Sequence, residues 1–327
     1  MLSPKENFME TLKGGRPDAF VNEWEPFGFV SDPLREATDA ARKGEYVVDG
    51  WGTTIYWGED EPGAMPWIRE DNKAIPDITE WKKYIKSPDL DQKLDWTGAK
   101  AEAEKFHKQG KLTLAVMKTG LFEQSHFLMG FEDTLMNYLL EPEASEELLD
   151  YITEYKLKYA CILIENLHPD VIMFHDDWGS KTKLFMSPDV WREFLKPRYE
   201  KIYSYIHSQG VIIMHHADSF CQEIAEDMAE LHIDVWQGIL PQNDIPAIQR
   251  AVGGRMVLMG GLEASIMDRK DYDEAVIREE VARACREYGP GGAFIPCLTY
   301  GGAGSIYPDV NELIMDEIRN QSRLYFK

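Results

Sequence analysis

The feature that most constrains the fold is a series of six short segments that are apolar at nearly every position. Strands buried on both faces have this pattern, and such strands are typical of parallel sheets. Helical segments separate several of them, and this alternation predicts successive βα units. The predicted strands are "KLTLAVM" (111–117), "PDVIMFH" (169–175), "GVIIMHH" (210–216), "IDVWQGI" (233–239), "RMVLMGG" (255–261) and "AFIPCL" (293–298).

Three segments between these strands have helical patterns: 143–167, 187–210 and 272–289. The second has the clearest boundaries, because Ser187 before Pro188 is a good N-cap followed by proline at the first helical position. Pro197 inside this segment predicts a kink, since proline removes a backbone donor.

A further strand near residues 45–58, and one in the N-terminal region that the pattern does not locate, would bring the count to eight. We therefore predict an α/β fold, a (β/α)8 TIM barrel with an irregular N-terminal extension, as a single domain over residues 1–327. An open doubly wound sheet is the alternative. The choice matters because barrel enzymes carry their catalytic groups at the carboxyl ends of the strands.

The charge balance argues against nucleic acid as a partner. The 327 residues include 35 Lys and Arg against 57 Asp and Glu, a formal net charge of −22 that repels polyanions. No apolar run is long enough to cross a membrane, and the N-terminus lacks the apolar core of a signal peptide. We expect a soluble, cytoplasmic protein without a membrane partner. The four cysteines have no CxxC spacing and are expected to be reduced.

Polar residues gather where the predicted strands end. The strand at 169–175 leads into "HDDWGS", with His175, Asp176 and Asp177, and the next strand leads into "HHADS". Adjacent carboxylates at a desolvated mouth shift each other's pKa, so we interpret these residues, together with His215, as candidate catalytic groups. The alternative for the aspartates is that one caps the following turn while Trp178 packs.

His216 and Asp218 are two residues apart and point to the same side of an extended segment, whereas His215 points to the other. Together with Cys297 they would give three ligands and an open fourth position, which is the stoichiometry of a catalytic zinc site. Glu263 in "GGLEA" is either a fourth ligand or the cap of the next helix. Cys221 competes with Cys297 for the ligand role, and a hydrogen-bonded histidine pair with a merely buried cysteine is the alternative to any metal.

Substrate contacts are expected from other strand ends and from one loop. The strand-end candidates are Lys118, Gln237 and Tyr300. The segment "DGWGTTIYWGEDEPGAMPW" (49–67) contains three tryptophans, including Trp57, among several glycines. Aromatic side chains beside glycine turns suit a wall or lid over a flat organic ligand, although a loop packing its own aromatics onto the barrel would look the same.

The order and spacing of these motifs also support a family resemblance. "PDVIMFHDDWGSKTKLFMSPDVWREFLKPRYEKIYSYIHSQGVIIMHHADSF", then "DVWQGILPQND" and "MGGLEA", resembles the uroporphyrinogen decarboxylase-like superfamily, and particularly its cobamide-dependent methyltransferase branch. The resemblance implies a TIM barrel. The decarboxylase itself binds its substrate's carboxylates through an arginine-rich N-terminal signature. The corresponding region, "GGRPDAFVNEWEPFGF", has only Arg16, so we exclude that activity.

The methyltransferase branch binds zinc through a His-x-Cys pair and a distant cysteine. His216 matches the histidine, Asp218 stands in place of the first cysteine, and Cys297 is offered for the second. The resemblance implies a zinc-dependent methyltransferase that moves a methyl group between a small methylated or methoxylated, in particular aromatic, substrate and the cobalt of a separate corrinoid (cobalamin) protein.

Two alternatives remain open. One is a decarboxylase or lyase of a small non-porphyrin acid that uses the Asp/His cluster, and the other is a non-catalytic corrinoid- or ligand-binding member of the superfamily. The sequence leaves the oligomeric state open, with a homodimer as one option.

Overall fold

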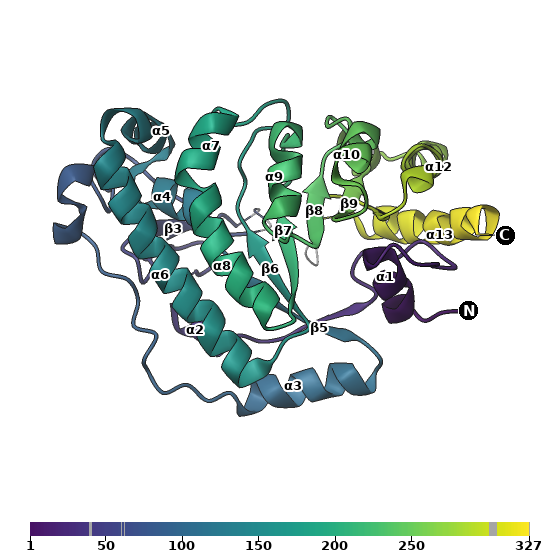
Figure 1. Ribbon diagram of the computed structural model, residues 1–327, viewed down its shortest axis with the longest axis horizontal. Coiled ribbons are helices and arrows are strands. Elements are labelled where there is room, and N and C mark those ends of the chain that lie inside the picture. The colour runs from purple at the N-terminus through teal and green to yellow at the C-terminus, as the bar shows by residue number, and fades with distance from the viewer. Residues whose placement is uncertain (39–40, 60, 62, 301–305, 327) are drawn as a thin grey trace.

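A computed structural model describes residues 1–38, 41–59, 61, 63–300 and 306–326, and it contains a curled parallel sheet of seven strands (Figure 1). The strand order is β1-β5-β6-β7-β8-β9-β10, and every neighbouring pair is parallel. The strands are β1 (Phe27–Phe29), β5 (Leu112–Met117), β6 (Val171–His175), β7 (Ile212–His216), β8 (Val235–Ile239), β9 (Val257–Gly261) and β10 (Phe294–Cys297).

The predicted TIM-barrel-like α/β fold is confirmed, and all six apolar segments form strands of this sheet. The strand that the sequence did not locate is β1, which pairs with β5. The prediction near residues 45–58 was wrong in its placement. That region forms a separate antiparallel sheet of β2 (Tyr46–Val48), β3 (Thr54–Tyr56) and β4 (Met65–Pro66). In the described part of the chain the parallel sheet therefore has seven strands, and β1 and β10 lie at its two ends.

A tight turn explains why residues 45–58 do not form a barrel strand. One carboxylate oxygen of Asp49 accepts hydrogen bonds from the backbone N–H groups of Trp51 and Thr53, both at 2.9 Å. This arrangement reverses the chain after the three residues of β2, because an aspartate that binds the N–H groups ahead of it replaces strand pairing with a turn. The strands of this hairpin are only three residues long, and they pair with each other and not with the parallel sheet.

Helices cover the outer face of the sheet, with α6 and α8 lying side by side across it in Figure 1. The predicted kink appears as a break between α7 and α8 at Leu195, and Ser187 caps α7 by accepting the Val190 N–H. The α-helices are α1 (Pro4–Leu12), α2 (Pro33–Thr38), α3 (Thr97–Lys108), α4 (Leu121–Met129), α5 (Phe131–Leu140), α6 (Pro142–Leu167), α7 (Pro188–Phe194), α8 (Lys196–Ser208), α9 (Ala225–Glu230), α10 (Ile245–Val252), α11 (Ala264–Met267), α12 (Glu274–Tyr288) and α13 (Pro308–Tyr325). The described residues also form the short 3-10 helices η1 (Ile78–Lys83), η2 (Gln222–Ile224) and η3 (Gly289–Gly291).

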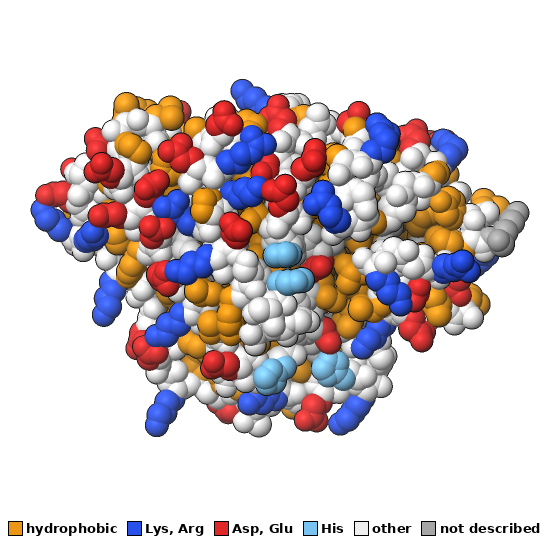
Figure 2. Space-filling view, in the orientation of Figure 1, with side chains coloured by type: hydrophobic (Ala, Val, Ile, Leu, Met, Phe, Trp, Pro, Cys, Tyr) orange, Lys and Arg blue, Asp and Glu red, His pale blue; other side chains and the backbone are white. Residues whose placement is uncertain are grey.

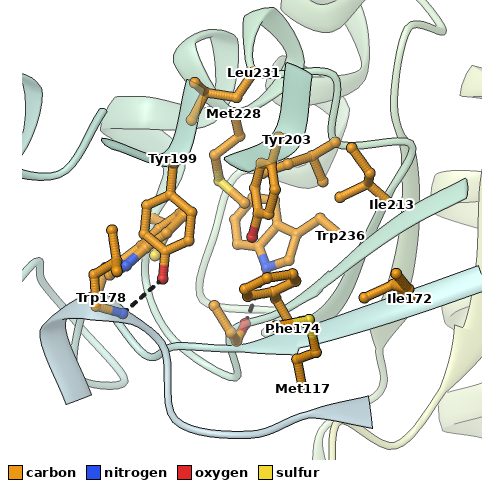
Figure 3. Close-up of a cluster of buried hydrophobic side chains, with 14 of the residues drawn as sticks. Met117, Ile172, Phe174, Trp178, Tyr199, Tyr203, Ile213, Met228, Leu231 and Trp236 are labelled. Atoms are coloured by element: carbon orange, nitrogen blue, oxygen red, sulfur yellow. Dashed lines mark hydrogen bonds between the residues drawn. The ribbon is translucent and has the colours of Figure 1, made fainter. Parts of the chain in front are cut away.

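Strand residues alternate between two hydrophobic clusters, one inside the curl and one under the helices. On β7, Met214 packs in the inner cluster and Ile213 in the outer one. Figure 3 shows part of the outer cluster, where Tyr199 and Tyr203 of α8 pack on Phe174 of β6. Because side chains alternate along a strand, every second residue after the inner apolar layers also points inward.

Charged side chains of both signs are interspersed over the face in Figure 2, without a continuous basic stripe there. Among the described residues, none of the helices is long and apolar enough to span a bilayer.

Candidate metal centre

The structure brings three of the predicted site residues together: His175, Asp177 and His216. Each offers one possible ligand atom, and these atoms lie within 4.8 Å of one another. His175 ends β6 and His216 ends β7, where the two residues are direct register partners. Their imidazole rings stack with centroids 4.4 Å apart and planes inclined by 23°. The cluster therefore lies at the carboxyl ends of adjacent strands, where barrel active sites form.

Each histidine has a buried hydrogen-bond partner. His175 Nδ1 lies 3.0 Å from Oε2 of Glu123, a residue near the start of α4. His216 Nδ1 contacts Oε1 of Gln237, its register partner on β8. Burial lowers the pKa of His175, but the charge and hydrogen bond of Glu123, together with the charges of Asp177 and Asp176, outweigh burial and raise the pKa to about 9. Burial and the nearby His175 lower the pKa of His216 to about 4, so this imidazole is neutral at physiological pH.

Asp177 supplies the carboxylate of the cluster and lies beside Asp218. The backbone N–H of Asp218 donates to Asp177 Oδ1 at 2.9 Å. Burial, together with the charge of Asp218, raises the pKa of Asp177 to about 8. A bound cation would offset this electrostatic cost, since opposite charge favours the ionised carboxylate. The cluster contains His216 and Asp177, and Asp218, the predicted partner of His216, lies next to Asp177.

Asp176 points to the other side of the strand end and is fully buried. Its carboxylate accepts hydrogen bonds from the backbone N–H groups of Phe122 and Glu123, from Trp178 Nε1 and from the Tyr199 hydroxyl, at 2.5–3.1 Å. The two backbone bonds join the end of β6 to the start of α4, an earlier element of the chain, and not to the following turn that was given above as the alternative to catalysis.

Gly120 is required where α4 starts. A Cβ atom there would lie only 2.2 Å from the Asp176 Cβ atom, so only glycine permits the approach. The Gly120 N–H also donates to the His175 carbonyl at 2.7 Å, which ties the residue before α4 to the end of β6.

His215 also faces the outer side and has no exposed surface. Its Nδ1 accepts from the Tyr203 hydroxyl at 2.7 Å, and its Nε2 lies 3.1 Å from the carbonyl oxygen of Asp176. The ring stacks on Trp178 with centroids 4.0 Å apart. Burial lowers its pKa to about 3. Both ring nitrogens of this candidate catalytic residue are therefore used within the protein core.

The other predicted ligands lie outside the cluster. Cys297 is fully buried among the inner apolar residues, and burial raises the pKa of its thiol well above the usual value. Glu263 is the N-cap of α11, where its side chain accepts from the Ser265 N–H and from Gln242. Cys221 is buried, and its Sγ lies 3.2 Å from the Ser219 hydroxyl.

The predicted substrate-binding residues are spread over the carboxyl-end loops. Gln237 reaches the cluster through His216. Lys118 lines a small cavity with Trp51 and Gln124, Trp57 Nε1 donates to the Glu61 carbonyl, and the Tyr300 hydroxyl donates to Asp268 at 2.8 Å. In the 49–67 segment, residues 60 and 62 lie outside the described residues.

Sequence reasoning missed Glu123, which contacts the cluster from α4. The residue predicted for the site after β5 is Lys118, and Glu123 lies six residues beyond the end of β5. The signal that could have found it is a glycine followed by an apolar segment with one internal glutamate, "GLFEQ", which predicts a helix start directly after a strand.

The fold and the position of the cluster define a TIM-barrel-like α/β protein with its polar site at the carboxyl ends of the strands. Residues 47–320 match the family model described as uroporphyrinogen decarboxylase (URO-D). The chain therefore belongs to the URO-D family.

The fold is shared by a solved structure. A methyltransferase from Methanosarcina mazei superposes with a TM-score of 0.65 at 18% identity, covering 98% of this chain and 99% of that chain. An α-amylase from Malbranchea cinnamomea matches with a TM-score of 0.38 at 9% identity, over 69% of this chain and 57% of its own. A search of curated protein sequences found no match.

Proposed function

We propose that the protein is a zinc-dependent methyltransferase that moves a methyl group between a small methylated or methoxylated aromatic compound and the cobalt of a separate corrinoid protein. The observation that carries the proposal is the convergence of His175, Asp177 and His216 at the strand ends of a URO-D family fold. The likeness to a methyltransferase in fold, over nearly the whole of both chains, supports the same reading.

The donor set fits zinc. Catalytic zinc sites use three protein ligands and keep one position for substrate, and two imidazoles with one carboxylate are among the known sets. We infer that His175, Asp177 and His216 would hold the metal. A bound zinc ion supplies Lewis acidity, which polarises the heteroatom that carries the methyl group. Asp218 lies beside Asp177 and, like it, is partly buried, so it is placed to orient a polar group of the substrate.

A decarboxylase or lyase that uses His215 for proton transfer receives less support from the geometry. His215 has no exposed surface, and both of its ring nitrogens already have partners. A general acid or base must reach the proton that it transfers. Proton transfer by His215 would require the buried contacts with Tyr203 and the Asp176 carbonyl to break first.

Metal analysis and a methyl-transfer assay test the proposal together. We expect about one zinc ion per purified chain, and we expect His175→Ala and His216→Ala to lose it while their circular dichroism spectra remain unchanged. Methoxylated aromatic acids and phenols would be supplied with a corrinoid protein reduced to Co(I), and methylcobalamin formation followed by absorbance. Exposed His107 replaced by alanine is the matched control. A zinc-free, folded wild-type protein that methylates no corrinoid would overturn the proposal.

A further inference from the structure

The hydrogen bonds behind the two cluster histidines fix which nitrogen of each ring faces away from the cluster. We infer that Glu123 and Gln237 are positioning residues that keep Nδ1 of His175 and His216 protonated, which leaves Nε2 of each ring as the nitrogen that binds a divalent transition metal. The inference rests on the proposed metal site and concerns two residues outside the ligand set.

The Gln237 side chain contacts Thr299, which lies two residues beyond the end of β10. The carbonyl oxygen of Thr299 can only accept a hydrogen bond, and it lies 3.1 Å from Gln237 Nε2. The Gln237 amide must therefore direct Nε2 toward Thr299, which turns Oε1 toward His216. An amide oxygen is an acceptor only, so the His216 Nδ1 that contacts it must carry the proton.

The hydrogen-bond partner of His175 is a carboxylate. Glu123 Oε2 accepts from His175 Nδ1 at 3.0 Å, and the Glu123 side chain is largely buried. The Glu123 backbone N–H is itself fixed, because it donates to Asp176 Oδ1 at 2.8 Å. Asp176 directly follows His175, the last residue of β6. The end of β6 therefore positions both partners of this hydrogen bond. It carries His175 directly, and it fixes Glu123 through the bond from the Glu123 N–H to Asp176.

The Glu123 carboxylate is charged and the Gln237 amide is neutral, so the two histidines differ as metal ligands. A carboxylate behind an imidazole raises the basicity of the far nitrogen, whereas a neutral amide fixes the ring with a smaller effect. We expect His175 to be the stronger ligand of the two. Gln237 has a second consequence, because its amide joins the metal cluster to the segment after β10 through Thr299.

Cobalt(II) titration of the purified, metal-free full-length chain tests the inference without reference to activity. Co(II) reports coordination through its visible d–d absorption, and competition with a chelator gives the affinity. Removing an outer partner of a ligating histidine costs about 10–100-fold in metal affinity. We expect such losses for Glu123→Leu and Gln237→Leu. Glu123→Gln and Gln237→Glu, which retain an acceptor for Nδ1, should bind more tightly than the leucine variants.

Gln242→Leu and Glu132→Gln are the matched controls, because both residues are exposed and lie outside the cluster. Circular dichroism checks that each variant is folded, and the acceptor-retaining variants serve if a leucine variant is not. Wild-type affinity and an unchanged Co(II) spectrum in all four test variants would overturn the inference. A wild-type chain that binds no Co(II) would remove the metal site itself, and one that binds Co(II) but transfers no methyl group would overturn only the proposed reaction.

Discussion

His175 and His216 lie side by side as register partners on β6 and β7, and their rings stack with centroids 4.4 Å apart. Neighbouring strands are separated by about 4.8 Å, so the sheet itself sets this distance between side chains at one level. The consecutive histidines His215 and His216 point to opposite sides instead. The chemically relevant pair is thus formed across two strands and not along the "HH" of the sequence.

Replacing Asp176 should destabilise the fold. Asp176→Ala would leave four buried donors, including Trp178 Nε1 and the Tyr199 hydroxyl, without their acceptor. At roughly 1–3 kcal/mol for each unsatisfied group, partly relieved by relaxation, we expect a loss of about 3–5 kcal/mol in the free energy of unfolding. Urea denaturation measures it. Asp189→Ala, at an exposed position on α7, should change stability little, and equal stabilities of the two variants would contradict this role of Asp176.

The regular part of the fold was predictable because periodicity is a local property. Continuous apolar runs located six strands, and Ser187 with Pro197 located the start and the break of a helix pair. β1 escaped because Phe27–Phe29 is three residues long and contains a glycine, which leaves too few positions to show a pattern. For the site, the residues His175, Asp177 and His216 were all in the predicted set, but their grouping depends on the register between strands. Glu123 depends on how α4 packs, which local sequence does not determine.

Cysteine is not expected to be needed for metal binding. Cys297 lies in the inner apolar cluster, and no thiol is among the three residues whose ligand atoms converge. We expect Cys297→Ser to retain stoichiometric zinc, with a modest loss of stability from burying a hydroxyl, whereas Asp177→Asn should lose the metal. Elemental analysis of both proteins decides. Zinc retained by Asp177→Asn and lost by Cys297→Ser would instead support the ligand set expected from the family resemblance, with Asp218 and Cys297.

Stability should fall as pH rises through the neutral range because of Glu23. Burial raises the pKa of this carboxyl from 4.5 to about 8, and its Oε1 atom has no hydrogen-bond partner. Between these two values the folded state binds more protons than the unfolded state, so the stabilisation present below pH 4.5 is lost as pH rises toward 8. The full shift corresponds to roughly 3–5 kcal/mol. Urea denaturation of Glu23→Gln between pH 5 and 9 should show a flatter profile than wild type, and parallel profiles would contradict the assignment.

Zinc should stabilise the wild-type chain against heat. A ligand that binds only the folded state at 100 times its dissociation constant adds about 2.7 kcal/mol. We expect added zinc to raise the melting temperature of metal-free protein by a few degrees in scanning fluorimetry. His216→Ala, which removes one of the three convergent ligands, should show no such rise. A rise of the same size in this variant would place the stabilising ion elsewhere.

Asp176 and Asp177 are adjacent, yet the Asp176 carboxylate joins β6 to α4 and the Asp177 carboxylate belongs to the cluster with His175 and His216. Their separation of roles depends only on the alternation of side chains at the strand end. Inserting or deleting one residue just before Asp176 would reverse the directions of both side chains. The Asp176 carboxylate would then point into the cluster, and the Asp177 carboxylate would point into the core. Variation among descendants of this chain should therefore be tolerated as substitutions here far more readily than as changes in length.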